Sequence, residues 1–299
     1  MNKKVLAVAL FTLSLAGCQG ANASIQNGND AIMTIGDKTY TKQDEYELIK
    51  KANGGVLTVQ LAKNVVYDKT VGVTDEIKKD AQKSYDDLKN DYDDLDDQLK
   101  QMGYADKDDY IETVLIPEQQ GLKLQKQYFT DNKDAIKKEY KPSLITVLKC
   151  DDEKTAQKAI DALKDGQDLA SVYEAYTSAD STYSNSEIVC TTLDTTLPTR
   201  AINEAYKAKK EGVIDEVFTN DDGTTYAYVI IVSSNDYDKN IDAYESTISA
   251  GDSFESEIWT YYFTKYDLQI HDQDIFDYLK VNNPEYLIDY PELSESDED

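Results

Sequence analysis

The hydrophobic pattern of this chain changes at Pro142. Before Pro142, apolar residues recur every three or four positions, which is typical of amphipathic helices. The longest series runs from Ile77 to Met102 and predicts one helix, with Thr74 as its N-cap. After Pro142, short β-branched and aromatic runs alternate with helical ones and end in the predicted strand TTYAYVIIV, residues 224–232. The pattern predicts an α+β fold, mainly helical, with an inserted small α/β domain.

Capping and turn signals predict elements in the first half. Residues 31–41 alternate apolar and polar side chains around Gly36, as a short hairpin does. Thr41 and Asp44 have the spacing of a capping box, so a helix should start at residue 42. Gly54 and Gly55 should end it. Further helices are expected at 56–71, 106–131, with a break or kink near Pro117, and 134–140.

The α/β part is expected to hold a small antiparallel or mixed sheet of four strands with helices. The strands are predicted at 143–150, 187–193, 213–220 and 224–232, and the helices at 152–166, 168–177 and 200–212. A further helix at 251–266 has aromatic and aliphatic residues four apart, a spacing more typical of a core than of a ligand site.

The first residues have the pattern of an export signal. Lys3 and Lys4 precede an apolar stretch, Val5 to Ala16, that is too short to span a bilayer as a stable helix. The sequence LAGC at 15–18 resembles a bacterial lipobox, which implies that Cys18 becomes the acylated first residue of the mature protein. An ordinary secretory signal with an incidental cysteine is the alternative.

Charge and cysteine content limit the partners and cofactors. Acidic residues outnumber basic ones 58 to 31, and no basic patch is present, so we expect no nucleic acid partner. Cys150 and Cys190 lie in no CxxC motif and near no histidine, so neither a metal site nor another cofactor is expected. In an exported protein these cysteines could form a disulfide, or remain two buried thiols. The lone His271, beside Asp272, is expected at the surface.

Several segments, in order, resemble the PrsA-type foldase lipoproteins. This family is related to the chaperone SurA and has a parvulin domain inserted in a helical chaperone module. The segments are AIMTIGDKTYTKQDEYEL, VTDEIKKDAQKSYDDL, KKEYKPSLITVL, EKTAQKAIDALKDGQDLASVYEAYTSADS, KEGVIDEVF and YDLQIHDQDIFDYLK. The resemblance implies a signal peptide at 1–17, a tether at 18–30, a chaperone module at 31–140, a parvulin-like domain at 141–236, a closing helix at 237–285 and an acidic tail at 286–299.

Parvulins accelerate rotation about X-Pro bonds by holding the twisted amide in an apolar cup lined with polar groups. Carried over residue by residue, the family pattern places a catalytic role on Asp180 and substrate binding on Leu197, Tyr206 and Val229. Both family histidines and the glycine turn are missing, so the resemblance implies weak or lost isomerase activity. For Asp180 a turn or helix-end role is the alternative, and for Leu197 and Tyr206 ordinary core packing.

The resemblance implies an extracytoplasmic foldase, lipid-anchored on the outer face of the cell membrane, whose partners are unfolded or nascent exported polypeptides; a dimer is compatible with it. Its working part would be an apolar crevice ringed by carboxylates in the helical module. A solute-binding lipoprotein of a transporter shares the export signal, but it would need two α/β lobes. A purely structural envelope protein is a third alternative.

Overall fold

The computed structural model describes residues 25–220, 223–251 and 254–294. The predicted signal peptide and Cys18 lie outside these residues. Two compact units are present: a helical unit, residues 25–124 with 256–294, and a sheet unit, Gln125–Glu255. The sheet unit is wider than the parvulin-like domain predicted at 141–236, whose boundaries stay a prediction. No helix in the described part of the chain is long and apolar enough to cross a bilayer.

The helical unit begins with the predicted hairpin, formed by β1 (Ala31–Ile35) and β2 (Lys38–Thr41), which are antiparallel. Gly36 has φ +64°, the left-handed conformation that this tight turn requires. Thr41 and Asp44 form the predicted capping box at the start of α2 (Lys42–Thr70).

Helix α2 does not end at Gly54 and Gly55, so the predicted stop there is wrong. A Cβ atom on Gly55 would lie 2.0 Å from the ring of Tyr278, in α13 (Gln273–Asn282). The glycine therefore serves the close approach of two helices, and a helix interior tolerates it at a cost of about 1 kcal/mol relative to alanine.

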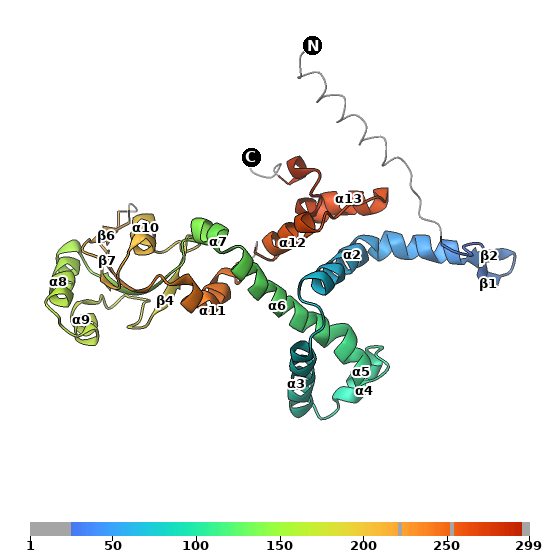
Figure 1. Cartoon of the computed structure of the whole chain (residues 1–299), viewed down its shortest axis with the longest axis horizontal. Coiled ribbons are helices and arrows are strands. Elements are labelled where there is room, and N and C mark those ends of the chain that lie inside the picture. The colour runs from blue at the N-terminus through green and yellow to red at the C-terminus, as the bar shows by residue number, and fades with distance from the viewer. Residues whose placement is uncertain (1–24, 221–222, 252–253, 295–299) are drawn as a thin grey trace, which may run out of the picture. The chain divides into compact units, whose positions relative to one another are not determined.

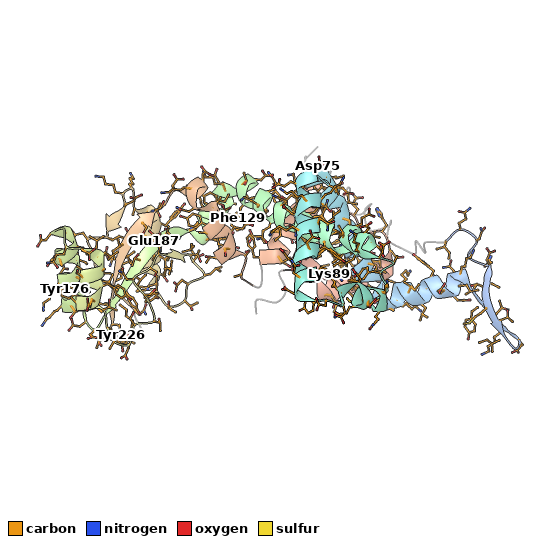
Figure 2. The ribbon with its side chains drawn as sticks, turned by 90° about the horizontal axis from the view of Figure 1, so that it is seen from below. Asp75, Lys89, Phe129, Tyr176, Glu187 and Tyr226 are labelled. Atoms are coloured by element: carbon orange, nitrogen blue, oxygen red, sulfur yellow. The ribbon has the colours of Figure 1, made fainter. Side chains whose placement is uncertain are left out.

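The helix predicted from Ile77 to Met102 is two helices, α3 (Asp75–Asp91) and α4 (Leu95–Gln101). Thr74 caps α3 as predicted, and Asp75 and Lys89 lie near its two ends (Figure 2). The chain is extended at Tyr92, with φ −131° and ψ 99°. Tyr85 and Lys89 of α3 both donate hydrogen bonds to Asp96. The apolar series still forms one core, because Tyr85, Leu95 and Leu99 belong to the same buried cluster.

The helical segment at 107–131 contains α5 (Lys107–Tyr110), a π-helical turn (Ile111–Leu115) and α6 (Ile116–Asp131). The irregular turn lies directly before Pro117, which lacks a backbone N–H, so the predicted break near this proline is confirmed. Apart from the helices that lie on the sheet, the remaining helices of the described residues are α7 (Lys133–Tyr140), α11 (Tyr237–Ile248), α12 (Phe254–Lys265) and α13, with 3₁₀ turns at Pro284–Tyr286 and Pro291–Leu293. The predicted closing helix at 237–285 is thus three helices.

The sheet unit contains an antiparallel sheet, which confirms the α+β class. Its centre is β3 (Ser143–Cys150) paired with β7 (Ala227–Ser234). The short strand β4 (Ile188–Cys190) pairs with β3, and β5 (Gly212–Val213) and β6 (Phe218–Thr219) pair with β7. The segment predicted as one strand at 213–220 is therefore two short ones, and β7 begins three residues later than expected.

Helices cover both faces of this sheet (Figure 1). On one face, α8 (Glu153–Lys164) and α9 (Leu169–Tyr176) bury Leu148 and Val229. On the other, α10 (Thr199–Lys207) buries Ile145 and Tyr228. Since neighbouring residues of a strand point to opposite faces, β3 and β7 supply both layers of core. In the described part of the chain only the sheet unit has an α/β arrangement, so the two lobes that a solute-binding protein needs are not found there.

Cys150 and Cys190 are free, buried thiols. Cys190 pairs with Ser143 at one end of β3, and Cys150 lies at the other end, roughly 20 Å away along the strand. This is far beyond disulfide geometry. Burial raises the pKa of both thiols to about 12, so they behave as small apolar core residues.

Candidate functional site

Exposed apolar side chains concentrate on the hairpin and α2. Of the sixteen large apolar residues exposed in the described part of the chain, ten lie on these elements. We call this set the arm surface: Ile32, Met33, Ile35, Tyr40, Leu48, Ile49, Val56, Leu57, Leu61 and Val65. Such an exposed apolar concentration on a monomer indicates an interaction site.

Two concavities lie on the arm surface. The first, of about 580 Å³, is enclosed by the hairpin and the first turns of α2, and its apolar lining includes Met33, Tyr40 and Leu48. The second, of about 390 Å³, lies between α2 and the loop before α13. Leu57 and Leu61 line it from α2, and the exposed His271 lines it from the loop.

Carboxylates border the first concavity. Asp44 and Glu45 both line it from the first turn of α2. A backbone hydrogen bond from Thr41, followed by one from the Thr41 hydroxyl, lowers the pKa of Asp44. This carboxylate is thus firmly ionised at neutral pH. The concavity therefore combines apolar walls with fixed negative charge, an arrangement suited to apolar segments that carry Lys or Arg.

A buried lysine, paired with two more exposed aspartates, lies beside the second concavity. The Lys50 side chain is only 5% exposed, and its Nζ lies 2.7 Å from Asp274 Oδ2 and 3.1 Å from Asp272 Oδ2. The hydrogen bonds to Asp274 and then to Asp272 raise the pKa of Lys50, and the one from Lys50 lowers the pKa of Asp274. The charged pair thus holds the start of α13 against α2.

The four residues predicted for a parvulin-type site do not converge. Asp180 is exposed in the turn after α9, where its carboxylate accepts a hydrogen bond from Tyr226 Oη at 3.1 Å. This bond raises the pKa of Tyr226, which lies at the same end of the sheet unit as Tyr176 (Figure 2). Asp180 thus lies in a turn, and its catalytic role stays a prediction.

The three predicted substrate-binding residues are separated by the sheet. Leu197 is buried in the core on the α10 face. Val229 is fully buried on the opposite face, under α8 and α9, and presents no surface to a ligand. Tyr206 is half-buried in α10, outside both sheet cores, and its carbonyl accepts from Asn235 Nδ2 at 3.4 Å. The structure therefore does not bring the predicted set together.

Tyr228, Ile230 and Val232 are the residues of β7 that face α10 with Leu197, and Tyr228 is the only one of them with a polar group. Its ring packs edge-on against Tyr183, with centroids 6.4 Å apart. Tyr183 Oη lies 2.6 Å from Thr196 Oγ1, and Asn220 Nδ2 donates to the Thr196 carbonyl at 3.3 Å. Burial raises the pKa of Tyr183. These hydroxyl and amide groups are neutral donors and acceptors, and no imidazole lies among them.

Alternation along β7 puts Tyr228 and Val229 on opposite faces of the sheet, and only the packing of α10 decides which of the two faces that helix. The predicted role of Val229 in substrate binding stays a prediction, and in the structure its side chain lies in the core under α8 and α9. The arm surface had a signal in the sequence. The apolar residues of α2 are spread around the helix rather than along one stripe, so one neighbouring element cannot cover all of them. No group of three or more His, Cys, Asp or Glu residues in the described ranges could hold a metal.

Comparison with known proteins identifies relatives of similar length. No family model matches the chain. It is 29% identical over 251 residues to the Foldase protein PrsA of Streptococcus agalactiae serotype V, covering 79% of this chain and 78% of the relative. The serotype Ia protein of the same name matches equally. The chain is a homologue of the PrsA-type foldases.

Solved PrsA structures also align with most of the chain. The peptidylprolyl isomerase PrsA from Bacillus cereus aligns with 85% of this chain and 98% of its own, at 19% identity and a TM-score of 0.47. PrsA from Bacillus subtilis aligns with 83% and 97%, at 18% identity and a TM-score of 0.36. The sequence identity to the Streptococcus agalactiae proteins bears out the resemblance indicated by the sequence motifs.

Proposed function

We propose that this chain is a foldase that holds unfolded exported polypeptides on the outer face of the cell membrane, where an acylated Cys18 anchors it. The observation that carries this proposal is the arm surface, with its two concavities and acidic border. The relatives named Foldase protein PrsA support the same assignment. The membrane anchor is supported by the lipobox-like sequence alone.

The arm surface suits capture without sequence specificity. Burying an exposed leucine or isoleucine on binding contributes about 1.5–3 kcal/mol, so a few such contacts hold an unfolded segment reversibly. The formal net charge of −27 keeps the foldase soluble despite this apolar surface and favours encounter with basic segments. A foldase of this kind needs no cofactor, and its chemistry is binding and release.

We expect substitution of the arm surface to impair chaperone activity. The double variant Leu57→Glu/Leu61→Glu places charges in the second concavity, where they must be desolvated when a client binds. The control is Leu122→Glu/Leu193→Glu, because these leucines are exposed to a similar degree but lie outside the arm surface. Light scattering of a denatured model client should show that the arm variant loses more than about half of the aggregation suppression and the control keeps it. Equal losses in both variants would contradict the proposal.

The sheet unit is proposed to contribute binding, with weak or lost prolyl isomerase activity. The only histidine of the chain, His271, belongs to the helical unit, so the sheet unit contains none. In a coupled proteolysis assay on a proline peptide, the rate of cis–trans isomerisation in the presence of the full chain should stay close to the uncatalysed rate. Activity near that of a histidine-containing parvulin, abolished by Tyr228→Phe, would instead assign catalysis to Tyr228 and the neighbouring Tyr183.

A further inference from the structure

The outer edge of β1 is an open strand edge. All five residues of β1 are exposed, and in the described part of the chain β1 pairs with β2 alone. A two-stranded hairpin is only marginally stable without a further strand or a packed face. The backbone of β1 therefore presents unpaired hydrogen-bonding groups that another strand could use.

This edge has few of the features that protect strand edges from pairing. The sequence AIMTI contains no charged residue and no proline, and its one irregularity, between Ala31 and Met33, leaves 33–35 in regular register. The sheet unit differs, because its outer strands β4, β5 and β6 are only two or three residues long. The hairpin is therefore the strand edge in the described residues that best accepts a partner.

The first concavity lies beside this edge and indicates what the partner must carry. Ile32 and Met33 of β1 line it together with Leu48 of α2. A strand added to a sheet directs alternate side chains to one face, so every second residue of a bound segment could enter the concavity. Glu45 borders it, is exposed, and makes no hydrogen bond or ion pair within the described ranges. A Lys or Arg flanking the apolar residues would find a carboxyl partner there.

We propose that β1 binds extended client segments by strand addition, selecting segments with apolar residues at alternate positions and a flanking Lys or Arg. This inference rests on the proposed function and specifies its substrate class: β-forming segments of exported proteins, captured before they pair in their own sheets. A second copy of the chain is a less suitable occupant, because each copy carries a formal net charge of −27 and association would bring like charges together.

The test measures binding of a fluorescent peptide to the full chain by fluorescence anisotropy. The peptide alternates Val and Thr and has a Lys at each end. A second peptide of the same sequence is N-methylated at alternate residues, which removes the N–H groups that a strand needs and keeps every side chain. N-methylation should weaken binding at least about tenfold, since it removes several backbone hydrogen bonds. Met33→Lys should weaken binding similarly, whereas Val281→Lys, an exposed apolar residue on α13, should leave it unchanged. Glu45→Gln should weaken binding only of the peptide with lysines, not of one with serines in their place.

Equal affinity for the two peptides would overturn strand addition, as would binding that Met33→Lys does not change. Sedimentation that shows a dimer dissociated by Met33→Lys would assign the edge to a second copy and also overturn the proposal. The proposed function is judged separately, on aggregation suppression by the same preparations. Suppression without discrimination between the peptides refutes strand addition alone, whereas absence of suppression refutes the foldase assignment.

Discussion

Replacing Phe129 by alanine is expected to lower the free energy of unfolding of the sheet unit by about 3–5 kcal/mol. Phe129 is fully buried, and its ring centroid lies 5.1 Å from that of Phe254 and 6.4 Å from that of Tyr128. Its backbone carbonyl accepts a hydrogen bond from Tyr237 Oη at 3.0 Å. The ring therefore packs α6 against α12, and the backbone carbonyl holds α11, on the side of the sheet unit away from Tyr176 (Figure 2).

Most of this cost arises because the surrounding rings cannot close the cavity that alanine leaves. Urea unfolding followed by circular dichroism would measure it. Phe129→Leu is the matched control: it keeps an apolar side chain of intermediate size, so its loss should be about 1–1.5 kcal/mol. If Phe129→Ala and Phe129→Leu lost the same free energy, the cavity explanation would be wrong.

Gly55→Ala is expected to destabilise the helical unit by about 1–3 kcal/mol, although alanine is the better helix former by about 1 kcal/mol. The added Cβ would lie 2.0 Å from Cδ1 and 2.2 Å from Cγ of Tyr278. These atoms lie at the base of the ring, so the clash cannot be relieved by moving a flexible side-chain end. Helix α13 must shift away from α2, which would also open the second concavity.

The neighbouring glycine gives the control. In Gly54→Ala the nearest atom to the new Cβ is Cδ1 of Ile275, at 3.0 Å, which is the end of a flexible side chain. This variant should change the free energy of unfolding by less than about 1 kcal/mol. Trp259 is the only tryptophan and is buried in the helical unit, so its fluorescence during urea unfolding reports on that unit. A stabilising Gly55→Ala would contradict the close approach of α13 to α2.

Capping residues, turn residues and β-branched runs in the sequence predicted the structural features that neighbouring residues determine. Side chains within a few positions predict the capping box at Thr41, the turn at Gly36, the strand at 143–150 and the last strand. The structure confirms these features, with the last strand at 227–234 instead of 224–232. The motifs in their order also indicated the PrsA relationship. The candidate site was less predictable, because the faces of the strands and the exposure of α2 are set by what packs against them.

The sequence by itself therefore determined the α+β class, the order of helices and strands and the acidic character of the protein. Only the tertiary structure decided that α2 continues through Gly54 and Gly55. Gly55 gives room inside the helix to the ring of Tyr278, which is more than two hundred residues away in the sequence. It also decided that Tyr228, not Val229, faces α10, because strand register is set by pairing between β3 and β7. Both outcomes depend on contacts between distant segments, which no local pattern encodes.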